Sequence, residues 1–140
     1  MFNPSRSQAR EFLFDLWAKH RAGAGLTALE SMALAVVLEH PEYHAYLDDR
    51  ENYLERDWRP EGGETNPFLH LQMHLAIEEQ LSIDQPPGIA ARVRALVARH
   101  GDRHEALHQA IECLAETMWR AQRDNAPPDA AAYLLCLEKK

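Results

Sequence analysis

Histidine and glutamate recur at one spacing in two parts of the chain. Both segments read H-x-x-x-H-x-A-I-E, and their polar residues are His70, His74 and Glu78, then His104, His108 and Glu112. Residues four apart lie about 40° apart around a helix axis, so each set forms one stripe along a helix. Imidazole and carboxylate ligands together suit iron, manganese or zinc. The repeat therefore predicts a divalent-metal site made from these six side chains, with one ion or two.

Glu30 is a further candidate ligand. Its neighbours at helical spacing, Ala33, Leu34 and Val37, are all apolar, so its carboxylate would point into the core. The same residue is the fourth of the segment T-A-L-E, which is a capping box that begins at Thr27. Glu30 is thus either a seventh ligand or only the reciprocal partner in that cap, and the sequence leaves both open.

A third histidine pair lies in the segment H-P-E-Y-H, at His40 and His44. His40 is expected at the end of a helix, because Pro41 disfavours helical backbone in the residue before it. Whether either histidine contributes a ligand stays open. His20 and His100 are expected at exposed helix ends, outside any site.

The segment H-E-A-L-H matches the zinc-protease pattern H-E-x-x-H in its letters. In that pattern Glu105 would act as the general base between His104 and His108. The pattern is short, however, and Glu105 is already explained by a cap that begins at Asp102. The match therefore adds little to the metal prediction.

The elements that must position these residues are helices. Apolar residues recur at helical spacing, and Ala and Leu outnumber the β-branched residues that favour strands. Long helices are predicted over residues 5–21, 27–40, 67–82, 89–100 and 102–123, with shorter ones after Pro41 to residue 47 and over 130–137. Asn3, Pro4 and Ser5 are the start signals of the first helix, and R-P-E-G-G-E-T-N over 59–66 is the clearest loop. The prediction is an all-α fold, a single-domain bundle of five to six helices over residues 1–140.

The helix over 67–82 has no polar side in the sequence. Met73, Ile77 and Leu81 lie beside the histidine stripe, and the other sides carry Leu69, Leu71, Leu75, Ala76 and Ile83. A helix that is apolar all round is normally buried. This helix and the one over 102–123 are therefore predicted at the centre of the bundle.

Composition excludes several classes of protein. The net charge of −7 argues against a nucleic-acid or anionic-membrane partner, because no basic face is available to neutralise phosphates. No run of about 18 apolar residues exists, and the first residues lack the apolar segment of a signal peptide, so a cytoplasmic protein is expected. Cys113 and Cys136 are far from C-x-x-C spacing and are expected as free thiols. The sequence indicates no particular protein partner, and a homo-oligomer is compatible with it.

Several segments resemble a known family. They are M-F-N-P-S-R at the start, H-P-E-Y-H, N-P-F-L-H-L-Q-M-H-L-A-I-E-E-Q-L-S-I-D-Q-P-P-G-I and A-A-Y-L-L-C-L. They look like a family of small proteobacterial proteins described only as a domain of unknown function. The resemblance spans the whole chain and implies a bacterial, cytoplasmic protein, but it carries over no catalytic residue. A looser likeness is to haemerythrin-like metal-binding bundles, and that is an analogy of fold.

The leading functional hypothesis is a metal-binding protein that holds iron, manganese or zinc. An oxidoreductase or a hydrolase would suit such a site, but no pattern decides whether the protein is an enzyme. The alternative is a metal-free binding or regulatory module, in which the histidines are structural or respond to pH.

Overall fold

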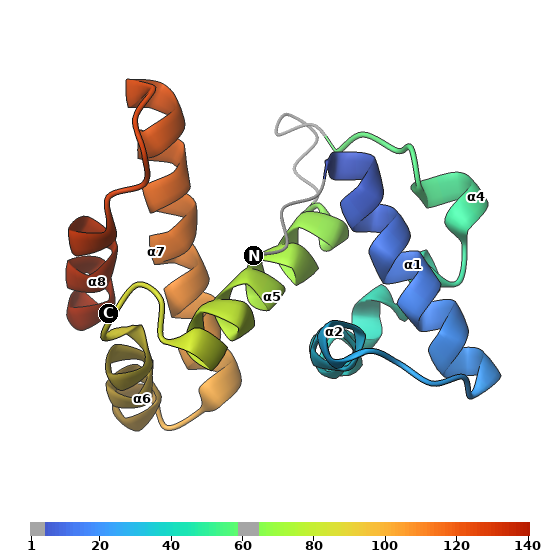
Figure 1. Cartoon of the computed structure of the whole chain (residues 1–140), viewed down its shortest axis with the longest axis horizontal. Coiled ribbons are helices and arrows are strands. Elements are labelled where there is room, and N and C mark those ends of the chain that lie inside the picture. The colour runs from blue at the N-terminus through green and yellow to red at the C-terminus, as the bar shows by residue number, and fades with distance from the viewer. Residues whose placement is uncertain (1–4, 59–64) are drawn as a thin grey trace. The chain divides into compact units, whose positions relative to one another are not determined.

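The computed structural model describes residues 5–58 and 65–140 (Figure 1). Regular structure in these residues is entirely helical, which confirms the predicted all-α class. They contain eight α-helices and one 3-10 helix, more than the five to six helices expected. The additional helices are short, and they include α3 (His44–Leu47) and α4 (Arg50–Tyr53). The start signals Asn3 and Pro4, and most of the predicted loop over 59–66, lie outside the described residues.

The chain divides into two compact units, Met1–Leu75 and Ala76–Lys140. The boundary falls inside α5 (Pro67–Ile83), which contributes its first half to one unit and its second half to the other. The predicted organisation as one domain stays a prediction.

The first unit is built on α1 (Arg6–Ala22) and α2 (Ala28–Leu38). Ser5 and Gln8 form a capping box at the start of α1, and Gly23 ends it with a φ of +70°, which glycine adopts without a steric penalty. α2 ends just before His40, and the 3-10 helix η1 (Pro41–Tyr43) follows. The core of this unit is apolar and aromatic, and it contains Leu13, Phe14, Leu16, Trp17, Ala33, Val36, Val37, Leu47, Phe68, Leu71 and Leu75.

The second unit contains the end of α5 and three helices that pack together, α6 (Ile89–His100), α7 (Arg103–Asp124) and α8 (Ala130–Lys139) (Figure 1). The predicted bounds of all three agree with these within two residues. Asp102 caps α7 by accepting a hydrogen bond from the Glu105 backbone N–H at 3.3 Å, as expected. The buried apolar residues of this unit include Ile77, Ile89, Val93, Leu96, Ala106, Leu107, Ala110, Leu114, Tyr133 and Leu137.

Cys113 and Cys136 form a disulfide that joins α7 to α8, so the expectation of free thiols was wrong. The two residues are separated by 23 positions in the chain, and the turn between α7 and α8 returns the chain to the same level. Spacing along a sequence predicts local motifs such as C-x-x-C. It carries no information on two cysteines that only the packing of two helices brings together.

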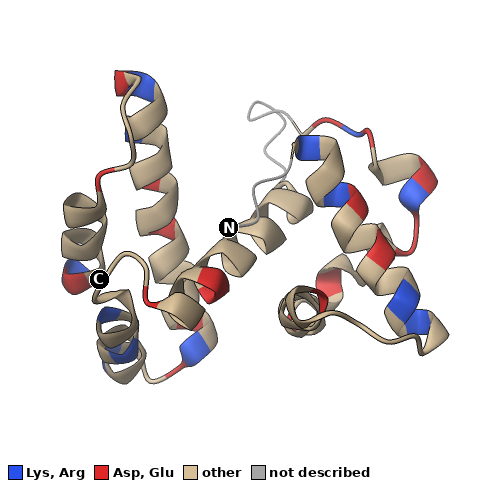
Figure 2. Ribbon diagram, in the orientation of Figure 1, with Lys and Arg blue, Asp and Glu red and all other residues tan. Residues whose placement is uncertain are grey.

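α5 is not buried on all sides, which corrects the prediction for this helix. Ile77 is fully buried, whereas Leu69 and Ile83 are 54 % and 58 % exposed. Met73 and Leu81 are half-buried. In Figure 2 the ribbon of α5 carries acidic residues only toward its C-terminal end and no Lys or Arg. Leu69 and Ile83 are apolar although they face solvent, so hydrophobicity alone does not mark which side of α5 is exposed.

The helices of the described residues are all too short or too polar to cross a lipid bilayer.

Candidate metal site

Three histidines of the first unit come together. His40 follows the end of α2, and His70 and His74 lie on the first half of α5. One ring nitrogen of each lies within 4.8 Å of those of the other two. The Nε2 atoms of His70 and His74 are 3.2 Å apart, and the ring centre of His40 is 4.5 Å from that of His74 and 5.2 Å from that of His70. The fold thus brings His40, from the end of α2, next to the pair formed by His70 and His74 on α5.

Local structure fixes His40 in this place. Pro41 keeps His40 out of the helix, with φ −125° and ψ 63°, while the His40 backbone N–H still donates to the Val37 carbonyl oxygen at 3.0 Å. The ring Nδ1 lies 2.8 Å from the Val36 carbonyl oxygen. A carbonyl only accepts hydrogen bonds, so Nδ1 carries the proton and Nε2 of the neutral ring carries the lone pair. Histidines that bind metals usually have this arrangement, with one nitrogen anchored to a carbonyl.

The cluster lies in an aromatic, mostly dry environment. His40 and His74 are 1 % and 2 % exposed, and His70 is half-buried. The ring of Tyr43 lies parallel to that of His40, with centres 5.6 Å apart. Burial, and then the nearby Glu42, raise the pKa of the Tyr43 hydroxyl, so this phenol stays neutral at physiological pH. Tyr43 was not among the predicted site residues, and nothing in its sequence context singled it out.

The spacing of the nitrogens is suitable for a metal ion. Two imidazole nitrogens on one tetrahedral zinc, each about 2.0–2.1 Å from the ion, lie about 3.3 Å from each other. The observed separation between the Nε2 atoms of His70 and His74 is 3.2 Å. The distance between these two nitrogens is therefore that expected of two ligands of one ion.

His44, the other member of the H-P-E-Y-H pair, has a different role. Its ring packs on that of Trp17, with centres 4.5 Å apart, and its Nε2 lies 2.9 Å from the Val37 carbonyl oxygen. The sequence left open whether His40 or His44 contributes to a site. In the structure His40 lies with His70 and His74, whereas His44 packs against α1. The signal for His40 was present in the sequence as a histidine forced out of a helix by the following proline.

The other predicted ligands lie in the second unit, except Glu30. Glu78 accepts hydrogen bonds from Arg103 at 2.8 and 3.2 Å. Glu112 accepts one from Lys140 at 2.7 Å. His104 and His108 lie one turn apart on α7, with ring centres 4.3 Å from each other. Both carboxylates thus have cationic partners, and their part in metal binding stays a prediction, as does that of the two histidines.

Glu30 forms the predicted capping box. Its Oε1 accepts a hydrogen bond from the Thr27 backbone N–H at 2.9 Å, and the Thr27 hydroxyl accepts one from the Glu30 backbone N–H at 3.1 Å. Its Oε2 accepts another from Lys19 at 2.8 Å. The carboxylate is buried, as the apolar neighbours suggested, but its contacts join the start of α2 to α1.

Glu30 should make the protein less stable in acid. The hydrogen bond from Lys19, and then that from the Thr27 backbone, hold the pKa of Glu30 below its ordinary value of 4.5. A carboxyl group with a lowered pKa stabilises the fold above its unfolded pKa, and this contribution is lost as the pH falls through the folded pKa. We expect Glu30→Gln to be less stable than the wild type at neutral pH, and the difference to shrink below about pH 4. Urea denaturation at both pH values measures it, and a difference independent of pH would contradict the assignment.

Comparison with known proteins places the chain in a family. Neither the curated proteins nor the solved structures include a significant match. A family model does match, over residues 5–139, and it therefore covers both units and all the histidines of the cluster. The chain belongs to the family described as a domain of unknown function, DUF1841.

Proposed function

We propose that this protein binds a divalent metal ion through His40, His70 and His74. The observation that carries the proposal is the convergence of three imidazoles whose ligand nitrogens lie within 4.8 Å of one another. The hydrogen bond of His40 Nδ1 to the Val36 carbonyl supports it, because it leaves the lone pair on Nε2. Iron, manganese and zinc all accept imidazole ligands.

A metal bound by these histidines could take part in a reaction if one coordination position stays open. Structural zinc sites have four protein ligands, whereas catalytic ones have three and keep a position for water or substrate. A metal held here would supply a Lewis acid or an activated water molecule. A hydrolytic or redox reaction would suit such a metal, and the buried surroundings of His40 and His74 would limit the access of water.

Metal titration of the protein, purified without a histidine tag, tests the proposal. Dialysis against Fe(II), Mn(II) or Zn(II), followed by elemental analysis, should show stoichiometric binding of at least one ion. His40→Ala and His74→Ala should each lower the bound metal strongly, and His20→Ala, an exposed histidine of α1, should leave it unchanged. Ligation needs neutral imidazole, so binding should weaken as the pH falls towards about 5.

Two further variants test which histidines matter. His44→Ala is the matched control, because His44 belongs to the same sequence pair as His40 but packs on Trp17. His108→Ala tests the ligand that the sequence repeat predicts on α7. Circular dichroism confirms that each variant keeps its helices. If the wild type binds none of the three ions more tightly than the folded His74→Ala variant does, the proposal is wrong.

The metal-free alternative rests on one contact. His70 and His74 can satisfy each other through their Nε2 atoms, 3.2 Å apart, when one carries the proton and the other accepts it. In that case the cluster would be a structural or pH-responsive element, since a cluster of charged imidazoles repels itself in acid. Failure to bind metal, together with a loss of stability in His74→Ala, would favour this function.

A further inference from the structure

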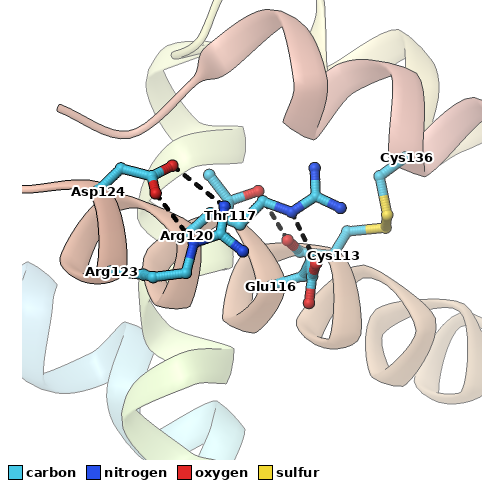
Figure 3. A network of polar contacts seen from close by, with 7 residues as sticks. All are labelled: Cys113, Glu116, Thr117, Arg120, Arg123, Asp124 and Cys136. Atoms are coloured by element: carbon cyan, nitrogen blue, oxygen red, sulfur yellow. Dashed lines mark hydrogen bonds and ion pairs between the residues drawn. A yellow bond between two sulfur atoms is a disulfide. The ribbon is translucent and has the colours of Figure 1, made fainter. Parts of the chain in front are cut away.

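The disulfide of the second unit lines an open pocket. The pocket lies beside α7 and α8, has a volume of about 730 Å³, and includes both Cys113 and Cys136 in its wall. Figure 3 shows the disulfide at one end of a row of polar side chains of α7, among them Glu116 and Arg120. A structural disulfide is usually enclosed by the core it stabilises, whereas this one adjoins a space that small molecules can enter.

The two cysteine residues differ in their exposure to solvent. Cys113 lies in the middle of α7 and is fully buried, with an exposure of 0 %. Cys136 lies on the shorter helix α8 and is half-buried. Thiol–disulfide exchange depends on access to the sulfur that is attacked. An incoming thiolate should therefore reach the sulfur of Cys136 and not that of Cys113.

The charges around the disulfide leave the α8 side open to an anionic thiol. Two carboxylates of the pocket wall are already neutralised: Glu116 pairs with Arg120 at 2.7 Å, and Asp124 with Arg123 at 2.9 Å. Lys139 and Lys140 lie three and four residues after Cys136, and therefore within about one turn of it. Cations close to the attacked sulfur attract an anionic incoming thiolate.

The cations are not all equally available. Lys140 forms an ion pair with Glu112 at 2.7 Å. Asp129, which also lines the pocket, caps α8 by accepting a hydrogen bond from the Ala132 backbone N–H. Lys139 is then matched by the negative charge of Asp129, which a backbone N–H does not neutralise. The charged side chains around Cys136 therefore balance, in a protein that is acidic as a whole.

We propose that Cys136 is a site of reversible thiolation by a low-molecular-weight thiol that enters this pocket. The thiolate attacks Cys136 Sγ, a new sulfur–sulfur bond forms between the thiol and Cys136, and the bond to Cys113 breaks. The electron pair leaves with Cys113 Sγ, which takes a proton from solvent. The reaction is an exchange, so no external oxidant is required and the mixed disulfide keeps the original oxidation level.

Contacts other than the disulfide keep Cys113 in place to reverse the reaction. The Tyr133 hydroxyl of α8 donates to Gln80 Oε1 at 2.8 Å, and Arg99 of α6 donates to the Leu137 carbonyl oxygen at 2.9 Å. Tyr133 and Leu137 are also buried. α8 should therefore stay docked after thiolation, and Cys113 can attack the mixed disulfide and release the small thiol. In the predicted cytoplasmic location disulfides are mostly transient or redox-sensing, which is the behaviour described here.

Mass spectrometry of the wild-type protein tests the site. The folded protein is incubated with millimolar reduced glutathione, quenched in acid, alkylated and digested. We expect glutathione on the peptide of Cys136 and the alkyl group on that of Cys113. Glutathione on Cys113, equal modification of both, or no mixed disulfide in protein that is still helical would overturn the proposal.

Two variants test the difference in access directly. Cys113→Ser leaves Cys136 as the single thiol, and Cys136→Ser leaves Cys113. With a chromogenic disulfide reagent, the first should react roughly tenfold or more faster than the second, and the two should react equally in denaturant. Equal rates in protein that circular dichroism shows to be folded would contradict the proposal. The wild-type mapping decides the question if either variant fails to fold.

Discussion

Replacing Arg10 by methionine is expected to destabilise the first unit by about 2–4 kcal/mol, because hydrogen bonds to charged groups and buried polar atoms left without a donor are each worth about 1–3 kcal/mol. Arg10 is only 2 % exposed although it lies on α1 among core residues. Its Nη1 donates to the carbonyl oxygens of Tyr53, Leu54 and Arg56, at 3.3, 3.0 and 2.6 Å. Methionine keeps most of the volume and removes all three contacts.

The carbonyls that Arg10 contacts belong to the end of α4 and the turn after it. The last carbonyls of a helix have no partner within the helix, and a cation there is favourable. The guanidinium also lies over the rings of Trp58 and Phe68, at 5.2 and 5.1 Å from their centres. Burial, and then repulsion from Arg6, lower the pKa of Arg10, but a guanidinium remains charged at any physiological pH.

Arg6→Met is the matched control for this experiment. Arg6 lies one turn earlier on α1 and also donates to the Arg56 carbonyl oxygen, at 2.7 Å, but its side chain is 55 % exposed. An exposed arginine contributes about 0–1 kcal/mol. Urea denaturation followed by tryptophan fluorescence measures both variants, since Trp58 reports on the contact itself. Equal losses in the two variants would show that Arg10 is not a structural cation of the core.

The short helix α4 could not be predicted from the sequence, because part of its stabilisation comes from another segment. The long helices have apolar residues at helical spacing, and Ser5, Thr27 and Asp102 cap their first turns as predicted. α4 has only four residues, and it is stabilised by Asp49 at its start and by Arg10 from α1. An arginine on an amphipathic helix such as α1 is normally expected to reach solvent, so the role of Arg10 in capping α4 could not be inferred before the packing was known.

In the candidate site, too, local features could be predicted from the sequence and contacts between segments could not. The spacing of His70 and His74 is a local property of α5, and the sequence therefore predicted that their side chains would meet. The approach of His40 is a property of the first unit, because the end of α2 has to pack against α5. For this reason the sequence left His40 and His44 equivalent, although only His40 joins the cluster.

The charged partners of the predicted carboxylates could not be inferred from the sequence either. Glu78 and Glu112 were selected because they extend the histidine stripe by one turn. Arg103 and Lys140, which contact them, lie 25 and 28 residues away in the chain. Periodicity along one helix identifies the residues that share a face, but not the side chains of other segments that meet that face.

The largest loss of stability in the second unit is expected from Ile77→Ala. Ile77 is fully buried on α5, and replacing a buried isoleucine by alanine removes apolar contacts and leaves a cavity. Changes of this kind cost about 2–5 kcal/mol. Urea denaturation followed by circular dichroism should show this loss without a change in helical content under native conditions.

Ile83→Ala on the same helix is the control that gives the experiment its meaning. Ile83 is the same residue type, at the last position of α5, and it is 58 % exposed. Surface substitutions usually change stability by no more than about 0.5 kcal/mol. The hydrophobic pattern of α5 gives no reason to distinguish Ile77 from Ile83, whereas the structure buries the first and exposes the second. The two variants therefore test whether burial in the structure determines the loss of stability. If both variants lose the same stability, α5 is buried on all sides, as the sequence alone indicated, and the exposed face described here is covered in solution.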